Sequence, residues 1–160
     1  MRHAKSDYPG GVADHDRPLA DRGIREAPLA GDWIRANAPD VDAVLCSTAT
    51  RTRQTLARTG IEAPVTYLDE LYDAVPGTVI AAINGVAEDV RTLLVVGHEP
   101  TTSGLALGLA DPDGDHDAAA VAQEISAKFP TSAIAVLRTD GAWADLALGG
   151  ATLVAFHVPR

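Results

Sequence analysis

The chain has 160 residues, a length that suits one compact domain and leaves little room for a second. Apolar residues make up 46% of the sequence and aromatic residues only 4%, so we expect a substantial core filled mainly by Ala, Val, Leu and Ile. A net charge of −9 argues against nucleic acid or an anionic membrane as a partner, and no apolar run reaches the roughly 18 residues that a membrane span needs.

Short apolar, β-branched runs alternate with alanine-rich stretches along the chain, a pattern typical of an α/β domain. In chain order we expect a helix over 21–37, a strand over 41–46, a helix over 49–59, a strand over 64–68, a helix over 77–86, a strand over 92–96, helices over 101–110 and 118–128, and strands over 133–137 and 151–158. The run over 92–96 is apolar on both faces, so it should lie centrally in a sheet that helices cover. The last two runs lie close together around a turn, which favours an antiparallel addition at the sheet edge. The sequence therefore predicts a three-layer sandwich with a largely parallel central sheet, an antiparallel edge and helices on both faces.

Three polar segments stand out, and each precedes a helix or loop at the place where we expect a strand to end. They cover residues 2–6, 46–51 and 96–101. Because ligands bind at the carboxyl ends of strands in open α/β sheets, we expect the three segments to converge on one pocket.

The residue types in these segments suit phosphoryl transfer. A neutral imidazole is a good nucleophile toward phosphorus and an acceptable leaving group afterwards. The planar fork of an arginine grips two phosphoryl oxygens and keeps its proton, so Arg2 and Arg51 are candidates for a phosphate clamp. His98 lies between Gly97 and Pro100, which is typical of the first turn of a helix, where backbone N–H groups favour an anion.

The same segments resemble the histidine phosphatase superfamily. Its signature, Arg-His followed by Gly or Ala, is matched by residues 2–4, and its Ser-Pro-x-x-Arg-x-x-Gln-Thr stretch by residues 47–55, with Thr48 in place of proline. Residues 94–98 match the apolar strand that ends in the second histidine of the family. The short chain is similar to the SixA branch, the protein-phosphohistidine phosphatases, as are the segments 17–19 and 131–133.

The resemblance implies a role for individual residues. It makes His3 the nucleophile that takes the phosphoryl group, with no metal or other cofactor required. It implies that Arg2, Arg51 and His98 are phosphate ligands and that Arg17 is a further pocket residue. The family's proton donor usually lies between the second arginine and the second histidine, where Glu70 is the first candidate and Asp73 the next.

One feature departs from the family. Only Met1 and Arg2 precede His3, whereas related enzymes begin with several apolar residues ahead of the Arg-His pair. We therefore expect that residues 1–160 form a single histidine phosphatase domain whose first strand is truncated at the N-terminus.

The same residues are compatible with two other functions. The substrate is expected to be a phosphorylated protein or a small phosphate ester, so a phosphomonoesterase or mutase of a small metabolite on the same scaffold is the nearest alternative. A non-catalytic phosphate-binding module is the alternative from another class. His15, His116 and His157 lack the tight spacing of zinc sites, so we expect no metal site. We expect a cytoplasmic protein, because the sequence shows no secretory leader and its single cysteine, Cys46, cannot form an internal disulfide.

Overall fold

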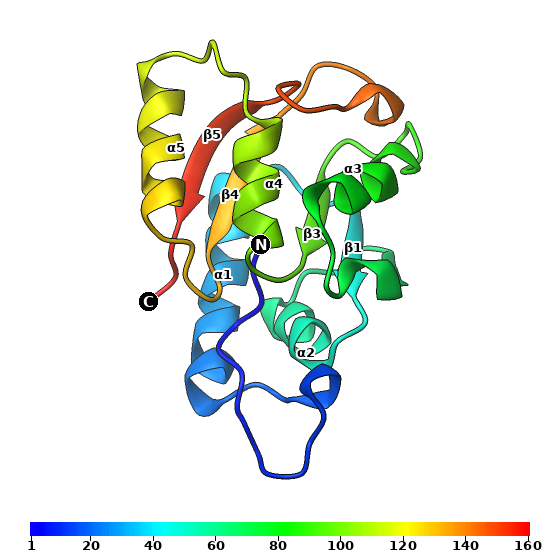
Figure 1. The fold of residues 1–160 in the computed structure, drawn as a ribbon, viewed down its shortest axis with the longest axis vertical. Helices are drawn as coiled ribbons and strands as arrows, with labels where there is room; N and C mark the ends of the chain where they lie inside the picture. Colours follow the sequence, from blue (N-terminus) through cyan, green and yellow to red (C-terminus); the bar gives the residue numbers. More distant parts are fainter.

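The computed structural model describes residues 1–160, and its elements alternate as the sequence predicts (Figure 1). The helices are α1 (Asp21–Asn37), α2 (Thr50–Thr59), α3 (Pro76–Asn84), α4 (Thr101–Leu109) and α5 (His116–Ala127), the strands are β1 (Ala43–Ser47), β2 (Val65–Leu68), β3 (Leu93–Val96), β4 (Ile134–Arg138) and β5 (Thr152–His157), and short 3-10 helices are η1 (Asp14–Asp16), η2 (Asp69–Leu71) and η3 (Trp143–Asp145). Every expected helix and strand is present, with ends within about two residues of the prediction, as is usual for element boundaries. No helix is both long enough and apolar enough to cross a membrane.

Local sequence signals account for several of these ends. Pro76 begins α3, where its missing N–H costs no helical hydrogen bond. Gly60 ends α2 with a φ of 71°, a left-handed conformation that glycine adopts without a steric penalty. The side chain of Asp115 accepts a hydrogen bond from the backbone N–H of Ala118 and so caps the start of α5.

The sheet consists of two parts joined by the first residues of the chain. One part is parallel and has the order β2-β1-β3, and the other is the antiparallel pair β4-β5. The segment 1–3 runs between them. His3 N–H donates to Gly97 O at 3.0 Å on the β3 side, and Arg2 N–H donates to Ala133 O at 3.0 Å on the β4 side. The predicted parallel sheet with an antiparallel edge is confirmed, and β3 lies centrally, between β1 and residues 1–3.

Helices cover both faces of the sheet because alternate strand residues point to opposite sides. Val44 and Cys46 of β1 pack in a core with α1 and α2, whereas Leu45 packs with α3 and α4 on the other face. A third core joins α4 and α5 to β5 through Leu153 and Ile125. The three predicted layers are therefore present.

A cavity of about 650 Å³ lies between the two parts of the sheet, lined by residues of both β3 and β4. Met1 is among its lining residues, and its amino group is fully buried and donates to Val95 O at 2.8 Å. Burial lowers the pKa of this amino group from 8.0 to about 5, because a charged amine cannot be hydrated there. Beyond Met1, the two sheet edges face each other without a strand between them, as Figure 1 shows.

Candidate active site

His3 is held by backbone bonds on both sides of the segment that joins the two sheets. Its N–H donates to Gly97 O and its C=O accepts from the N–H of Ser132, each at 3.0 Å. The ring Nδ1 lies 2.7 Å from Ala4 O. A carbonyl oxygen only accepts, so Nδ1 carries the proton and Nε2 keeps its lone pair. The fold therefore fixes the tautomer that a nucleophilic imidazole needs.

A close approach between the first residues and α1 supports this placement. Ala20 N–H donates to Lys5 O at 2.9 Å, just before α1 begins. A Cβ on Gly23 would lie 2.2 Å from the same Lys5 oxygen, so only glycine lets the segment after His3 pack against the helix. Ala4 N–H donates to Thr55 Oγ1 of α2 at 2.8 Å, which ties the segment to a second helix.

Three cationic or imidazole side chains surround His3, and each has a polar atom without a partner. Arg51 extends from the first turn of α2 and His98 follows β3, and both are at most 9% exposed. The His98 ring lies 5.3 Å from the His3 ring, centroid to centroid. Arg2 Nε, Arg51 Nε and His98 Nδ1 are buried and make no hydrogen bond. Buried polar groups are normally paired, so these atoms indicate a place for an anionic ligand.

The second ring nitrogen of His98 is fixed by a residue at the end of β1. His98 Nε2 lies 2.8 Å from Ser47 Oγ, and Ser47 is fully buried. The same hydroxyl accepts from Ala49 N–H at 3.3 Å. Ser47 thus orients the imidazole so that Nδ1 is the nitrogen left for a ligand.

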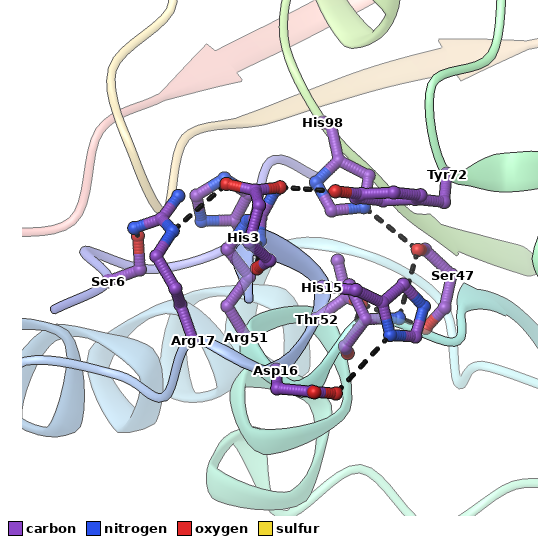
Figure 2. Close-up of polar contacts among 12 residues, drawn as sticks. His3, Ser6, His15, Asp16, Arg17, Ser47, Arg51, Thr52, Tyr72 and His98 are labelled. Carbon is purple, nitrogen blue, oxygen red and sulfur yellow. Dashed lines mark hydrogen bonds and ion pairs between the residues drawn. The ribbon is translucent and has the colours of Figure 1, made fainter. Parts of the chain in front are cut away.

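Arg17 and Arg51 meet on a carboxylate that the sequence analysis did not single out, that of Asp14 in η1. Arg17 Nε donates to Asp14 Oδ1 at 3.0 Å, and Arg51 Nη2 to Asp14 Oδ2 at 3.2 Å. Arg51 Nη1 also donates to the backbone oxygen of Asp14 at 2.8 Å. The Tyr72 hydroxyl donates to Asp14 Oδ2. In Figure 2, Arg17 lies on one side of His3, with His98 and Tyr72 on the other.

The environment keeps both histidines neutral. Burial lowers the pKa of His3 from 6.5 to about 3, and the positive charges of Arg51 and Arg2 act in the same direction. Burial likewise lowers the pKa of His98 to about 4, again with help from Arg51. Desolvation is the larger cause at His3, and the repulsion by the arginines adds to it. The imidazole is thus available as a nucleophile well below neutral pH.

The predicted residues do not all gather at His3. Arg2, Arg51 and His98 lie close enough to His3 for their charges to lower its pKa, and Arg17 is joined to Arg51 through Asp14. Glu70 lies in η2 with an exposed side chain that makes no hydrogen bond, and Asp73 is exposed as well. Their roles as proton donors therefore stay predictions.

Two members of the network, Asp14 and Tyr72, were missed by sequence reasoning. Asp14 lies three residues before Arg17, and Tyr72 lies beside the carboxylates that drew attention as proton donors. The spacing of Asp14 from Arg17 is the one signal that could have found it, because a residue three positions away can reach back across a short 3-10 turn. Nothing local marks Tyr72, which meets Asp14 across 58 positions of sequence.

Comparisons with known proteins agree with this geometry. The family model of the histidine phosphatase superfamily (branch 1) matches residues 1–79. An uncharacterised protein of Mycobacterium tuberculosis is 69% identical over 160 residues, which is the full length of both chains. A solved protein of Nakamurella multipartitia, named as a phosphohistidine phosphatase SixA, is 45% identical with a TM-score of 0.89, over 99% of this chain and 93% of that one.

A second solved structure was determined in complex with an oxyanion. The protein histidine phosphatase SixA in complex with tungstate is 27% identical, with a TM-score of 0.74, over 98% of this chain and 92% of that one. Tungstate is a tetrahedral oxyanion like phosphate. The chain belongs to the histidine phosphatase superfamily, within its SixA group of phosphatases.

Proposed function

We propose that this phosphatase removes phosphoryl groups from histidine side chains of a protein, through a covalent intermediate on His3. The lone pair of His3 Nε2 attacks phosphorus in line, and the bond between phosphorus and the substrate nitrogen breaks with its electron pair on that nitrogen. Water then attacks the phosphorylated His3, releases inorganic phosphate and regenerates the free imidazole, while the water's proton passes to solvent. Arg2, Arg51 and His98 hold the phosphoryl oxygens, and Arg17 supports the same pocket.

This proposal rests on one observation: the tautomer of His3 leaves Nε2 with a lone pair, and buried polar atoms without partners lie around it. Nδ1 is committed to Ala4 O, so Nε2 is the nucleophilic atom. Arg2 Nε and Arg51 Nε are buried donors without a partner in the protein, and His98 Nδ1 is a third when the Ser47 hydroxyl donates to His98 Nε2. The transferred phosphoryl group spreads its charge over three equatorial oxygens, which need donors of this kind.

The substrate class follows from the leaving group. An imidazole leaves easily, because its second ring nitrogen can carry a proton, whereas an alkoxide needs an acid positioned beside it. Tyr72, Arg17 and Arg51 hold the pKa of Asp14 well below its usual range, so this carboxylate is ionised and has no proton to give. Glu70, the proposed donor for an ester substrate, is exposed and bonds to none of the residues around His3. These features favour phosphohistidine over the phosphate ester of a small metabolite.

The proposed cycle requires no metal, because two guanidinium groups and an imidazole N–H supply the charge stabilisation that a metal would otherwise give. Excess chelator should therefore leave turnover unchanged. A loss of activity that added magnesium or zinc restores would overturn this part of the proposal.

The test of the whole cycle is trapping of the intermediate. Wild-type protein is mixed with a phosphohistidine protein, quenched without acid, and mapped by mass spectrometry. Phosphate is expected on His3, and His3→Asn should abolish turnover while tungstate still raises the thermal midpoint of the variant. Label on another residue, or undiminished turnover by His3→Asn, would refute the mechanism. Tungstate binding without any turnover by wild type would instead indicate a non-catalytic phosphate-binding module.

A further inference from the structure

The carboxylate of Asp14 is the only acidic group bonded to the arginines of the site, and the cycle described above gives it no task. It receives hydrogen bonds from Arg17, Arg51 and Tyr72. Its side chain is nevertheless 55% exposed, whereas the Arg17 and Arg51 side chains are 11% and 7% exposed. Asp14 therefore lies on the side of the two arginines that faces solvent.

The contacts between Asp14 and Arg51 leave one edge of the guanidinium available to a phosphoryl oxygen. It engages the two terminal nitrogens, Nη1 and Nη2, through its backbone oxygen and its carboxylate. Nε of the same guanidinium keeps its hydrogen free. The guanidinium of Arg51 thus has separate edges for Asp14 and for a phosphoryl oxygen, and the two need not compete.

The carboxylate also has unused acceptor capacity. An ionised carboxylate offers about four lone-pair sites, and three are occupied, one on Oδ1 and two on Oδ2. The free site is on Oδ1, and the other oxygen, Oδ2, links the carboxylate to a group of aromatic side chains through the Tyr72 hydroxyl. The Tyr72 ring packs edge-on against His98 at 5.4 Å and against His15 at 4.8 Å, centroid to centroid, and both Tyr72 and His15 are partly exposed.

A phosphohistidine carries a second ring nitrogen that decides how easily the phosphoryl group leaves. If that nitrogen bears a proton, the bond to phosphorus breaks to give a neutral imidazole. If it does not, the ring must depart as an anion. A fixed carboxylate beside the remote nitrogen stabilises the protonated ring, as an opposite charge does for any histidine.

We propose that Asp14 is a specificity-determining residue that accepts a hydrogen bond from the protonated remote nitrogen of the substrate imidazole, whose ring packs against Tyr72 and His15. The phosphoryl group binds His98, Arg2 and the Nε edge of Arg51, and the leaving ring faces the opposite side of the clamp. The proton stays on the remote nitrogen throughout, so the ring departs as neutral imidazole. This inference rests on the proposed function, and it explains why an ionised carboxylate stands in a site built for anions.

The experiment compares two substrates whose leaving groups differ in charge. Asp14→Asn keeps the size of the side chain and an oxygen acceptor but removes the charge. Steady-state rates are measured on phosphohistidine and on 4-nitrophenyl phosphate, whose phenolate leaves without a protonated nitrogen. Asp14→Asn should lower kcat on phosphohistidine about tenfold to hundredfold, which is the usual effect of losing a charged hydrogen bond. Any loss of kcat on 4-nitrophenyl phosphate, caused by weaker bonds to Arg17 and Arg51, should be several-fold smaller than the loss on phosphohistidine.

The matched control is Asp16→Asn, which removes the same charge from the same 3-10 helix. The Asp16 side chain is 69% exposed and contacts only His15, at 3.7 Å, so neither rate should change. Equal losses on both substrates for Asp14→Asn would mean that Asp14 merely positions the arginines. A lower KM for both substrates would mean that the carboxylate competes with the phosphoryl group. Either result overturns the inference while His3 labelling still supports the proposed function.

Discussion

Acid should unfold this protein for a reason that can be traced to two side chains. The pKa values of His3 and His98 are lowered by burial to about 3 and about 4, against 6.5 for an unperturbed histidine. Below about pH 6.5 the unfolded chain therefore takes up protons that the folded protein cannot accept. Since the unfolded state binds more protons, the free energy of unfolding falls as the pH is lowered from 6.5 toward these values.

The size of this effect follows from the pH window. At pH 5.0 the medium is about 1.5 units below the unfolded pKa and still above both folded values. Each unit corresponds to 1.36 kcal/mol, so each histidine should contribute about 2 kcal/mol to the loss of stability between pH 7.5 and 5.0. Carboxylates titrate mostly below this window. The Met1 amino group, with a pKa lowered to about 5, adds to the loss equally in wild type and in histidine variants.

The assay is urea denaturation of wild type, His3→Asn and His98→Asn at both pH values. Asparagine does not titrate, so the difference in unfolding free energy between pH 7.5 and 5.0 should be about 2 kcal/mol smaller for each variant than for wild type. His116→Asn, at the exposed start of α5, is the matched control and should follow wild type. Equal pH differences in wild type and both site variants would show that the two imidazoles are not kept neutral by burial, and the reasoning above would fail.

Three further predictions concern the clamp, the proton donor and the sheet. Arg51→Lys keeps the charge but loses the fork, so turnover should fall about 10²-fold, and kinetics within threefold of wild type would place Arg51 outside the pocket. Glu70→Gln and Asp73→Asn should each leave phosphohistidine turnover nearly unchanged, whereas a metabolite phosphatase would lose roughly 10²- to 10⁴-fold with one of them. Because the facing edges of β3 and β4 are not paired with a strand beyond Met1, adding five apolar, β-branched residues ahead of Met1 should raise the thermal midpoint, and an unchanged midpoint would contradict the expected pairing.

The last of these predictions rests on the geometry at Met1. An amide N–H in place of the Met1 amino group would make the same bond to Val95 O, and it avoids the cost of holding deprotonated an amine whose pKa burial lowers from 8.0 to about 5. The added residues would pair with the facing edges of β3 and β4 and fill the cavity of about 650 Å³ between them. Adding the same number of Gly and Ser residues is the matched control, because these restore the amide but not the apolar packing.

Much of the fold could be predicted because its signals are local. Helical and strand periodicity is carried by neighbouring residues, so the bounds of α1 and β3 follow from short windows of sequence. Arg51 and His98 could be found because each lies where a strand ends or a helix begins, where the fold presents side chains to ligands, and His3 could be found because residues 2–4 match the Arg-His signature of the family. The resemblance to a known family then supplied their roles.

The rest depends on contacts between distant segments. Asp14 meets Arg51 across 37 positions and Tyr72 across 58, and no local pattern carries such a pairing. The balance between burial and charge at His3 could not be predicted either, because the cost of desolvation depends on how completely the fold closes over the ring. The sequence identified the charged residues near His3, but it could not show how completely the fold buries the His3 ring.

The burial of His3 away from water links the chemistry of the site to its stability. Removing water from His3 keeps the nucleophile neutral, and it strengthens every interaction between the clamp and a phosphoryl group. The same burial leaves donor atoms of Arg2, Arg51 and His98 without partners, and buried donors without partners destabilise the free protein. A bound oxyanion would satisfy all three, so the site is least stable when empty and most stable when a phosphoryl group occupies it. This is the relation expected of a pocket organised around the reaction rather than around its own stability.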